Sequence, residues 1–344
     1  MVQYAEAADP VPFAIRVVAR AFLLVYLFVE ALFSHHMVYK YRTLNKKIME
    51  KEILDKYIKA GRIAAQVRDY AQLLVKKDAL VVDIAEEIEK KTFNLGGRPA
   101  FPVNISINDM AAHYHPLIND KLTIKEGDYV KVDVGVHVDG YIGDTAVTIR
   151  IDCKDDLIIC SEKMLENAIK IITVGTTIGE IGETIENTAK EFGFNPIRNL
   201  TGHSLGHYDV HAGLTVPNVK NDSKYQLRED DVIAIEPFCT AGNGLVKDSG
   251  SPLIFRWIND RPTRMVESRK ILEMARDRFE RLPFAKRWIE KEFSPMKVEL
   301  SLKELTAANA LYGYQPLREV SFKPVAQAEH TLIIREKPII TTLL

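Results

Sequence analysis

The 344-residue chain has little of what marks several classes of protein. Its three cysteines, Cys153, Cys160 and Cys239, form no CxxC pair, which excludes a disulfide scaffold and favours reduced thiols in the cytoplasm. Lysine and arginine total 46 against 47 aspartates and glutamates, a formal net charge of -1. Because non-specific nucleic-acid binding needs an excess of positive charge, a role in coating DNA or RNA is disfavoured. With 47% apolar and 27% charged residues, the composition is typical of a globular protein.

The chain also lacks an apolar run long enough to span a membrane. Charges interrupt the stretch Ala14–Phe33, and its uninterrupted part, Ala21–Val29, has nine residues, where about 20 are needed. No small-x-small cleavage site follows, which disfavours a signal peptide. Residues 1–36 are therefore expected to be an extension of doubtful origin: residues upstream of the true start, an extra helix or a weak anchor. The main domain is expected at 37–344.

Helical and strand patterns alternate after this extension, which predicts a mixed α/β fold. Helical periodicity covers residues 45–76 (broken or bent near Gly61), 82–92, 157–172 and 179–192. Strand patterns cover 101–107, 128–136, 145–151, 231–235, 320–322 and 331–334. Charged helical patterns at 265–292 and 302–311 predict a helical insertion at about 256–317. The sequence thus describes one body with an insertion near its C-terminal end.

One pattern occurs twice. Residues 126–133 and 229–236 each consist of an acidic turn followed by a short strand that ends in a carboxylate, Asp133 or Glu236. The repetition is a weak indication of two related halves.

Several carboxylates lie in strands that are otherwise apolar. Asp133 and Asp144 flank a hairpin, and facing positions of an antiparallel pair lie within about 5 Å. Glu236 and Glu329 occupy similar apolar settings, and His203 belongs to a group of three histidines. Carboxylates held this closely repel one another unless a cation lies between them. Four carboxylates and one imidazole suit divalent first-row ions, and they are too many for one open zinc site, so a two-metal site is predicted.

Here the chain resembles a known family, the type 2 methionine aminopeptidases of the creatinase-like "pita-bread" metallopeptidases (M24). The matching motifs are AFPVNISIN and AAHYHP within 100–116, KVDVGVHVDGYIGDTAVT at 131–148, LTGHSLGHYDVHAGLTVPN at 200–218, IAIEPF at 233–238 and QAEHTLI at 327–333. The resemblance implies an α/β (α+β) pita-bread fold, in which two pseudo-symmetric halves form a curved antiparallel sheet backed by helices. The segment at 256–317 is similar to the insertion that separates type 2 from type 1.

The resemblance also implies a site. Two divalent ions (Co, Mn, Fe or Zn) would be held by Asp133, Asp144, His203, Glu236 and Glu329, with Asp144 and Glu329 bridging. The substrate would be bound by His113, His211, Phe101 and Tyr314, with His113, His211 and Glu236 as the catalytic residues. The implied activity removes the N-terminal methionine of newly made proteins when the next residue is small. Proximity to the ribosome, a monomeric state and no nucleic-acid specificity are further expectations.

Two rival functions were weighed against this one. Xaa-Pro aminopeptidases and prolidases share the fold and ligands, but too few residues precede Phe101 for their additional domain. A binding module without activity is disfavoured because all five ligand positions are kept. His115 and His207 are expected on the surface or beside the site, and the cysteines as thiols in the core.

Overall fold

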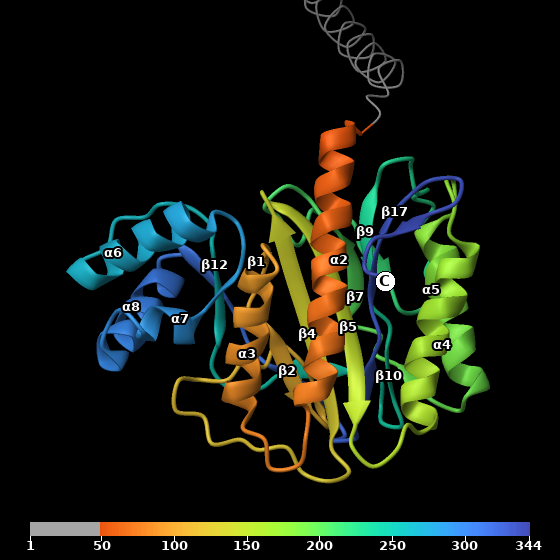
Figure 1. Ribbon diagram of the computed structural model, residues 1–344, viewed down its shortest axis with the longest axis horizontal. Helices are drawn as coiled ribbons and strands as arrows, with labels where there is room; N and C mark the ends of the chain where they lie inside the picture. Colours follow the sequence, from red (N-terminus) through yellow and green to blue (C-terminus); the bar gives the residue numbers. More distant parts are fainter. Residues whose placement is uncertain (1–48) are drawn as a thin grey trace, which may run out of the picture. The chain divides into compact units, whose positions relative to one another are not determined.

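The computed structural model describes residues 49–344 (Figure 1). Residues 1–36, for which an extension is predicted, lie outside the described residues. The helices are α2 (Lys51–Leu74), α3 (Val81–Asn94), α4 (Asp156–Ile171), α5 (Ile178–Glu191), α6 (Val266–Met274), α7 (Lys286–Glu290) and α8 (Pro295–Ala307). A π-helical turn, η1 (Ala275–Phe279), directly continues α6. None of the helices in this part of the chain is long and apolar enough to cross a bilayer.

The first half of the body is an antiparallel sheet covered by α2 and α3. Its strands are β1 (Arg98–Pro99), β2 (Asn104–Ile107), β4 (Tyr129–Val138) and β5 (Tyr141–Arg150), in the order β1-β4-β2 with β5 paired to β4. Valines of β4 pack with isoleucines and valines of the two helices in one core. At the hairpin turn, Asp139 and Gly140 have φ of 50° and 83°, the backbone geometry that a tight two-residue turn requires.

Helix α2 runs without a break through Gly61, so the predicted interruption there is wrong. A Cβ on Gly61 would lie 2.5 Å from Thr341, and a Cβ on Gly143 would lie 2.5 Å from the Gly61 Cα. Gly61 therefore allows helix α2 to pack closely on β5. An isolated glycine within a helical pattern can indicate such close packing as well as a break.

The second half repeats this arrangement with α4 and α5. Its main sheet has the order β18-β17-β9-β7-β8, and a smaller one has the order β16-β10-β6. The strands are β6 (Asn195–Pro196), β7 (Thr201–Ser204), β8 (Thr215–Pro217), β9 (Val232–Ile235), β10 (Phe238–Thr240), β16 (Val325–Gln327), β17 (His330–Ile333) and β18 (Ile339–Ile340). Thr177 and Glu180 form a capping box at the start of α5. The mixed α/β architecture in two similar halves agrees with the predicted fold class.

The insertion contains strands as well as the predicted helices. Strands β12 (Ile254–Trp257), β13 (Phe284–Ala285) and β14 (Leu311–Tyr314) form a sheet in the order β13-β12-β14, and α6, α7 and α8 complete a separate small core (Figure 1). A further sheet, in the order β11-β15-β3, consists of β3 (Met110–Ala112), β11 (Val246–Asp248) and β15 (Leu317–Glu319). Strands of two to four residues have too few alternations to be recognised beside charged helical patterns.

Two smaller predictions are wrong. Residues 320–322 form a turn rather than a strand, because the Glu319 carboxylate accepts hydrogen bonds from the backbone N–H groups of Ser321 (2.6 Å) and Lys323 (3.2 Å). Cys153 is exposed, whereas Cys160 and Cys239 are core thiols as expected.

Candidate metal centre

Five residues predicted as metal ligands lie around one cavity between the two halves of the body. Asp133 is in the middle of β4, Asp144 is in β5 and His203 is in β7. Glu236 directly follows β9, and Glu329 directly precedes β17. The sequence separates these residues widely, and the two similar sheets bring them together.

The two aspartates are diagonal neighbours rather than directly facing residues. The β4–β5 ladder pairs Asp133 with Ala146 and Asp144 with Gly135. Diagonal positions offset by two residues still share one face of the sheet. Both carboxylates therefore face the cavity that they line.

The ligand-type atoms lie within coordinating range of a common ion. His203 Nε2 is 3.7 Å from Asp144 Oδ2 and 3.4 Å from Glu236 Oε1. One ligand atom each of Asp144, His203 and Glu329 all lie within 4.8 Å of one another. These three residues are only 2%, 6% and 2% exposed. The space between them can accommodate a cation that is largely shielded from bulk water.

Burial raises the pKa values of all four carboxyl groups, and repulsion by neighbouring carboxylates adds to the rise for three of them. Burial raises the pKa of Asp133 to about 7, against a hydrogen bond from Gln327 that lowers it. Burial, followed by the charge of Asp133, raises the pKa of Asp144 well above its ordinary value. The pKa values of Glu236 and Glu329 are raised for the same two reasons, burial first and neighbouring carboxylates second. The four carboxyl groups thus lack a nearby positive charge that would stabilise their ionised forms.

The protein itself supplies no cation to these carboxylates. Among residues 49–344, no lysine or arginine forms an ion pair with any of the four. Asp133 Oδ1 and Asp144 Oδ1 are buried without a hydrogen-bond partner in this part of the chain. His203 is neutral, since burial and then His211 lower its pKa to about 3. Four hard oxygen donors with one neutral imidazole fit divalent metal ions.

Threonine side chains hold the ligand-bearing strands in position. The backbone N–H of Asp144 donates to Thr331 Oγ1, and that hydroxyl donates to the Asp144 carbonyl, both at 2.8 Å. Thr145 Oγ1 donates to the carbonyl of Glu329 at 2.8 Å and accepts from Arg68 Nη1 at 3.0 Å. Neighbours that restrain the ligands in this way reduce the reorganisation needed for an ion to bind.

The predicted substrate residues line the same cavity. The His211 ring centroid is 4.6 Å from that of His203 and 6.1 Å from that of Tyr314, and the rings of His113 and Tyr314 are 5.6 Å apart. Burial, followed by a cationic or imidazole neighbour, lowers the pKa values of His113 and His211 to about 4. Both imidazoles are therefore neutral near pH 7. Phe101 forms an apolar part of the cavity wall.

Four further residues line this cavity: Asn104, Val210, Ile254 and Pro283. Asn104 pairs with Asp133 in the β2–β4 ladder, and its Oδ1 is buried without a partner among residues 49–344. Its place in the motif at 100–116 was the only signal in the sequence. Ile254 and Pro283 belong to the insertion, and nothing in their local sequence indicates contact with the site.

Comparison with known proteins identifies the family of this chain. Residues 55–260 match metallopeptidase family M24, and the chain belongs to that family. Its curated relatives include the methionine aminopeptidases of Thermococcus onnurineus, 48% identical over 85% of this chain and 99% of the relative, and of Pyrococcus abyssi, 45% identical over 84% and 99%. These relatives place the chain among the methionine aminopeptidases and make it a metal-dependent peptide hydrolase.

Solved structures confirm the fold. A thermophilic Arx1 aligns with a TM-score of 0.76 at 18% identity, over 85% of this chain and 91% of that one. The methionine aminopeptidase of Thermotoga maritima aligns with a TM-score of 0.63 at 23% identity, over 87% and 99%. The prolidase of Pyrococcus furiosus aligns with a TM-score of 0.55 at 17% identity, over 86% and 65%. The same fold thus occurs with more than one substrate specificity.

Proposed function

We propose that this enzyme removes the N-terminal methionine of newly made proteins when the second residue is small. The observation that carries the proposal is the group of four buried carboxylates and His203, which has no cation of its own and opens onto a cavity lined by Phe101 and Tyr314. A slot between such side chains suits the unbranched, polarisable methionine side chain. The methionine aminopeptidase relatives support this substrate over others that the fold accepts.

Two divalent ions, Co, Mn, Fe or Zn, would be held by the five ligands, with Asp144 and Glu329 shared between them. Asp144 and Glu329 suit the shared role because both are buried within reach of His203. When bound, such ions supply Lewis acidity that lowers the pKa of water and polarises the scissile carbonyl. The donor set does not select one metal over the others, because all of them accept carboxylate and imidazole ligands.

The residues of the chain would divide the remaining work. Neutral His211 has one N–H to donate, and we assign it to the developing oxyanion of the scissile peptide. His113, also neutral, has its ring 5.6 Å from that of Tyr314 and would orient the substrate. Glu236 would accept a proton from the attacking water and deliver it to the leaving amine. Its Oε1 atom lies 3.4 Å from His203 Nε2, next to the other ligand-type residues.

A panel of tripeptides tests the proposal. Met-Ala-Ser should lose methionine, whereas Met-Leu-Ser and Ala-Pro-Ser should be left intact, because the second residue must be small and the slot fits methionine. Cleavage of Ala-Pro-Ser alone would move the protein to the proline-specific branch of the fold. No cleavage with Mn, Fe, Co or Zn added to folded protein would favour the binding module instead.

The proposed substrate indicates where the enzyme acts. New N-termini arise in the cytoplasm at the ribosome, so we propose that the enzyme acts there, as a monomer and with no nucleic-acid specificity. The net charge of -1 supports the last point.

Residues 1–36 are proposed to be dispensable. A chain that begins at Met37 should therefore be folded and cleave Met-Ala-Ser at the rate of the full chain, as measured by methionine release. Loss of soluble protein on that truncation would contradict the proposal.

A further inference from the structure

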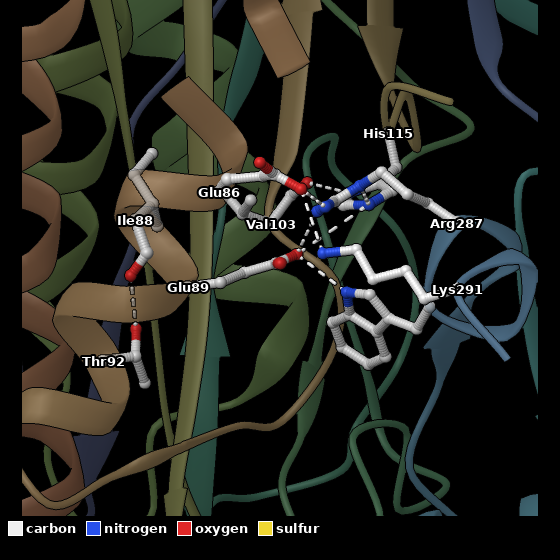
Figure 2. A network of polar contacts seen from close by, with 9 residues as sticks. Glu86, Ile88, Glu89, Thr92, Val103, His115, Arg287 and Lys291 are labelled. Atoms are coloured by element: carbon white, nitrogen blue, oxygen red, sulfur yellow. Dashed lines mark hydrogen bonds and ion pairs between the residues drawn. The ribbon is translucent and has the colours of Figure 1, made fainter. Parts of the chain in front are cut away.

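The insertion contacts α3 of the body through a fully buried arginine, beside which Lys291 donates to Glu86 at 2.9 Å (Figure 2). Arg287, in α7, is 0% exposed. Its Nη1 donates to Glu86 at 3.0 Å and its Nη2 donates to Glu89 at 2.7 Å, both on α3. Its Nε donates to His115 Nε2 at 3.2 Å, and Trp288 Nε1 also donates to Glu89, at 2.9 Å. All three guanidinium nitrogens of Arg287 thus donate hydrogen bonds, and their acceptors lie on two separate segments of the body.

His115 carries this contact into the body. It is 1% exposed, so of the two expected positions, surface or beside the site, the surface is excluded. Because Arg287 Nε can only donate, His115 Nε2 accepts, and Nδ1 carries the proton that bonds the carbonyl of Val103 at 2.7 Å. Burial, followed by the charge of Arg287, lowers the pKa of His115 to about 3, so the imidazole stays neutral.

The segments held by His115 form one wall of the cavity. Val103 directly precedes Asn104, which lines the cavity, and His113 is two residues before His115. His113 has φ of 62°, a left-handed conformation that a non-glycine residue keeps only where its surroundings enforce it. The bond from His115 to Val103 joins the strand of Asn104 to the segment of His113 and provides such enforcement.

The insertion forms another wall of the same cavity. Ile254 and Tyr314 are paired across β12 and β14, and Pro283 precedes β13 in the same sheet. All three line the cavity. Helix α7 begins directly after β13, so Arg287 is two residues beyond the end of that sheet's edge strand at Ala285. Arg287 therefore connects the insertion wall to the body wall through α3 and His115.

We infer that Arg287 is a positioning residue that sets the separation of these two walls and hence the selectivity of the cavity for the first side chain of the substrate. The inference rests on the proposed function, which supplies methionine as that side chain. A slot of fixed width discriminates an unbranched side chain from a branched one of similar size, and a loosened slot does not. Arg287 acts through His115 and the two walls and does not itself line the cavity.

The variant Arg287→Lys tests this assignment, since it keeps the charge and removes the fork. Its KM for Met-Ala-Ser should rise about tenfold, and the ratio of kcat/KM for Met-Ala-Ser over Leu-Ala-Ser should fall about tenfold, while kcat changes less than about threefold. The metal content should equal that of the wild type. Arg278→Lys is the matched control, because Arg278 pairs with Glu292 on the exposed surface of the same insertion and should change none of these values.

An unchanged KM and an unchanged ratio in folded Arg287→Lys would overturn the inference, as would a loss of kcat alone. If Arg287→Lys does not fold, Glu89→Gln, of equal size, replaces it, and the ratio should fall about threefold. Should the wild type release no methionine, the proposed function fails, and amide hydrogen exchange decides the positioning role separately. Exchange within 103–106 and 113–116 should accelerate in Arg287→Lys and not in Arg278→Lys, and equal exchange in the two variants would refute it.

Discussion

The molecule buries two groups of charged side chains, which are neutralised in different ways. The carboxylate cluster, defined as Asp133, Asp144, Glu236 and Glu329 with His203, has no cationic partner among residues 49–344. The Arg287 cluster, defined as Arg287 with Glu86, Glu89 and His115, contains its own counter-charge.

The consequences for the acidic groups differ accordingly. In the carboxylate cluster, burial raises the pKa of every carboxyl group, and repulsion adds to the rise for Asp144, Glu236 and Glu329. In the Arg287 cluster, burial raises the pKa of Glu89, but the charge and hydrogen bond of Arg287 oppose the rise. Where the fold supplies the counter-charge, the cluster fastens parts of the chain together. Where the fold omits it, the cluster is prepared for an ion from solution.

The largest expected effect comes from removing one charge of the carboxylate cluster. Glu329→Gln should lower kcat/KM for Met-Ala-Ser by at least about 10³-fold, because the variant lacks a carboxylate that we propose as a shared metal ligand. The same variant should raise the melting temperature of the metal-free protein at pH 8, because one repelling carboxylate is gone. Methionine release and thermal unfolding measure the two effects. Glu292→Gln, at an exposed position, is the control and should change neither.

The Arg287 cluster should respond in the opposite way to loss of a charge. Arg287→Ala leaves Glu89 buried without its cationic partner and should lower the free energy of unfolding by about 3–5 kcal/mol. Arg278→Ala breaks an exposed pair of the same insertion and should cost at most about 1 kcal/mol. Urea unfolding of the metal-loaded proteins compares the two. Equal losses would show that the buried cluster is no more important than a surface ion pair.

The free energy of unfolding of the metal-free protein should depend on pH because of the carboxylate cluster. The folded-state pKa of Asp133, about 7, is above its ordinary value of 3.8, so its stabilising contribution is complete below about pH 4 and is lost as the pH rises through 7. The free energy of unfolding should fall by about 1.4 kcal/mol per pH unit for each such carboxyl over this window. Chemical unfolding at pH 5, 6 and 7 measures the slope. Saturating Mn²⁺ should abolish most of it, and a slope that Mn²⁺ leaves unchanged would contradict the account.

The smallest effect is expected from one neutral donor of the Arg287 cluster. Trp288→Phe removes the indole N–H that bonds Glu89 at 2.9 Å and should cost about 1 kcal/mol of unfolding free energy. Because Arg287 still neutralises Glu89, the selectivity for Met-Ala-Ser over Leu-Ala-Ser should be kept. A loss as large as that of Arg287→Ala in the same urea experiment would mean that the indole, not the guanidinium, holds the insertion.

The sequence predicted the carboxylate cluster better than the Arg287 cluster, for a physical reason. A carboxylate that interrupts an apolar strand, such as Asp133 or Glu236, is anomalous in its own surroundings, and the anomaly can be seen in a few residues. Arg287 lies in a stretch rich in charges, where an arginine is typical of a solvated helix face. Its burial depends on Glu86 and Glu89, which are about 200 residues away.

The fold shows the same limit. The long helices and the β4–β5 hairpin have enough residues for their periodicity to be recognised, and the structure confirms them. The sheet of the insertion was missed because β13 has only two residues. The contribution of Ile254 and Pro283 to the cavity was missed with it, since that contribution depends on tertiary placement alone.

The most direct test of the central claim is a metal titration of the stripped protein, followed by proton release and by methionine release from Met-Ala-Ser. The account predicts that Mn²⁺ or Co²⁺ binds at two equivalents per chain, that protons are released at pH 7 because the raised carboxyl groups must ionise, and that activity rises with occupancy. Glu329→Gln should lose at least one equivalent. Folded protein that binds no ion, or that binds ions equally well in Glu329→Gln, would contradict the claim that the carboxylate cluster is built for an external cation.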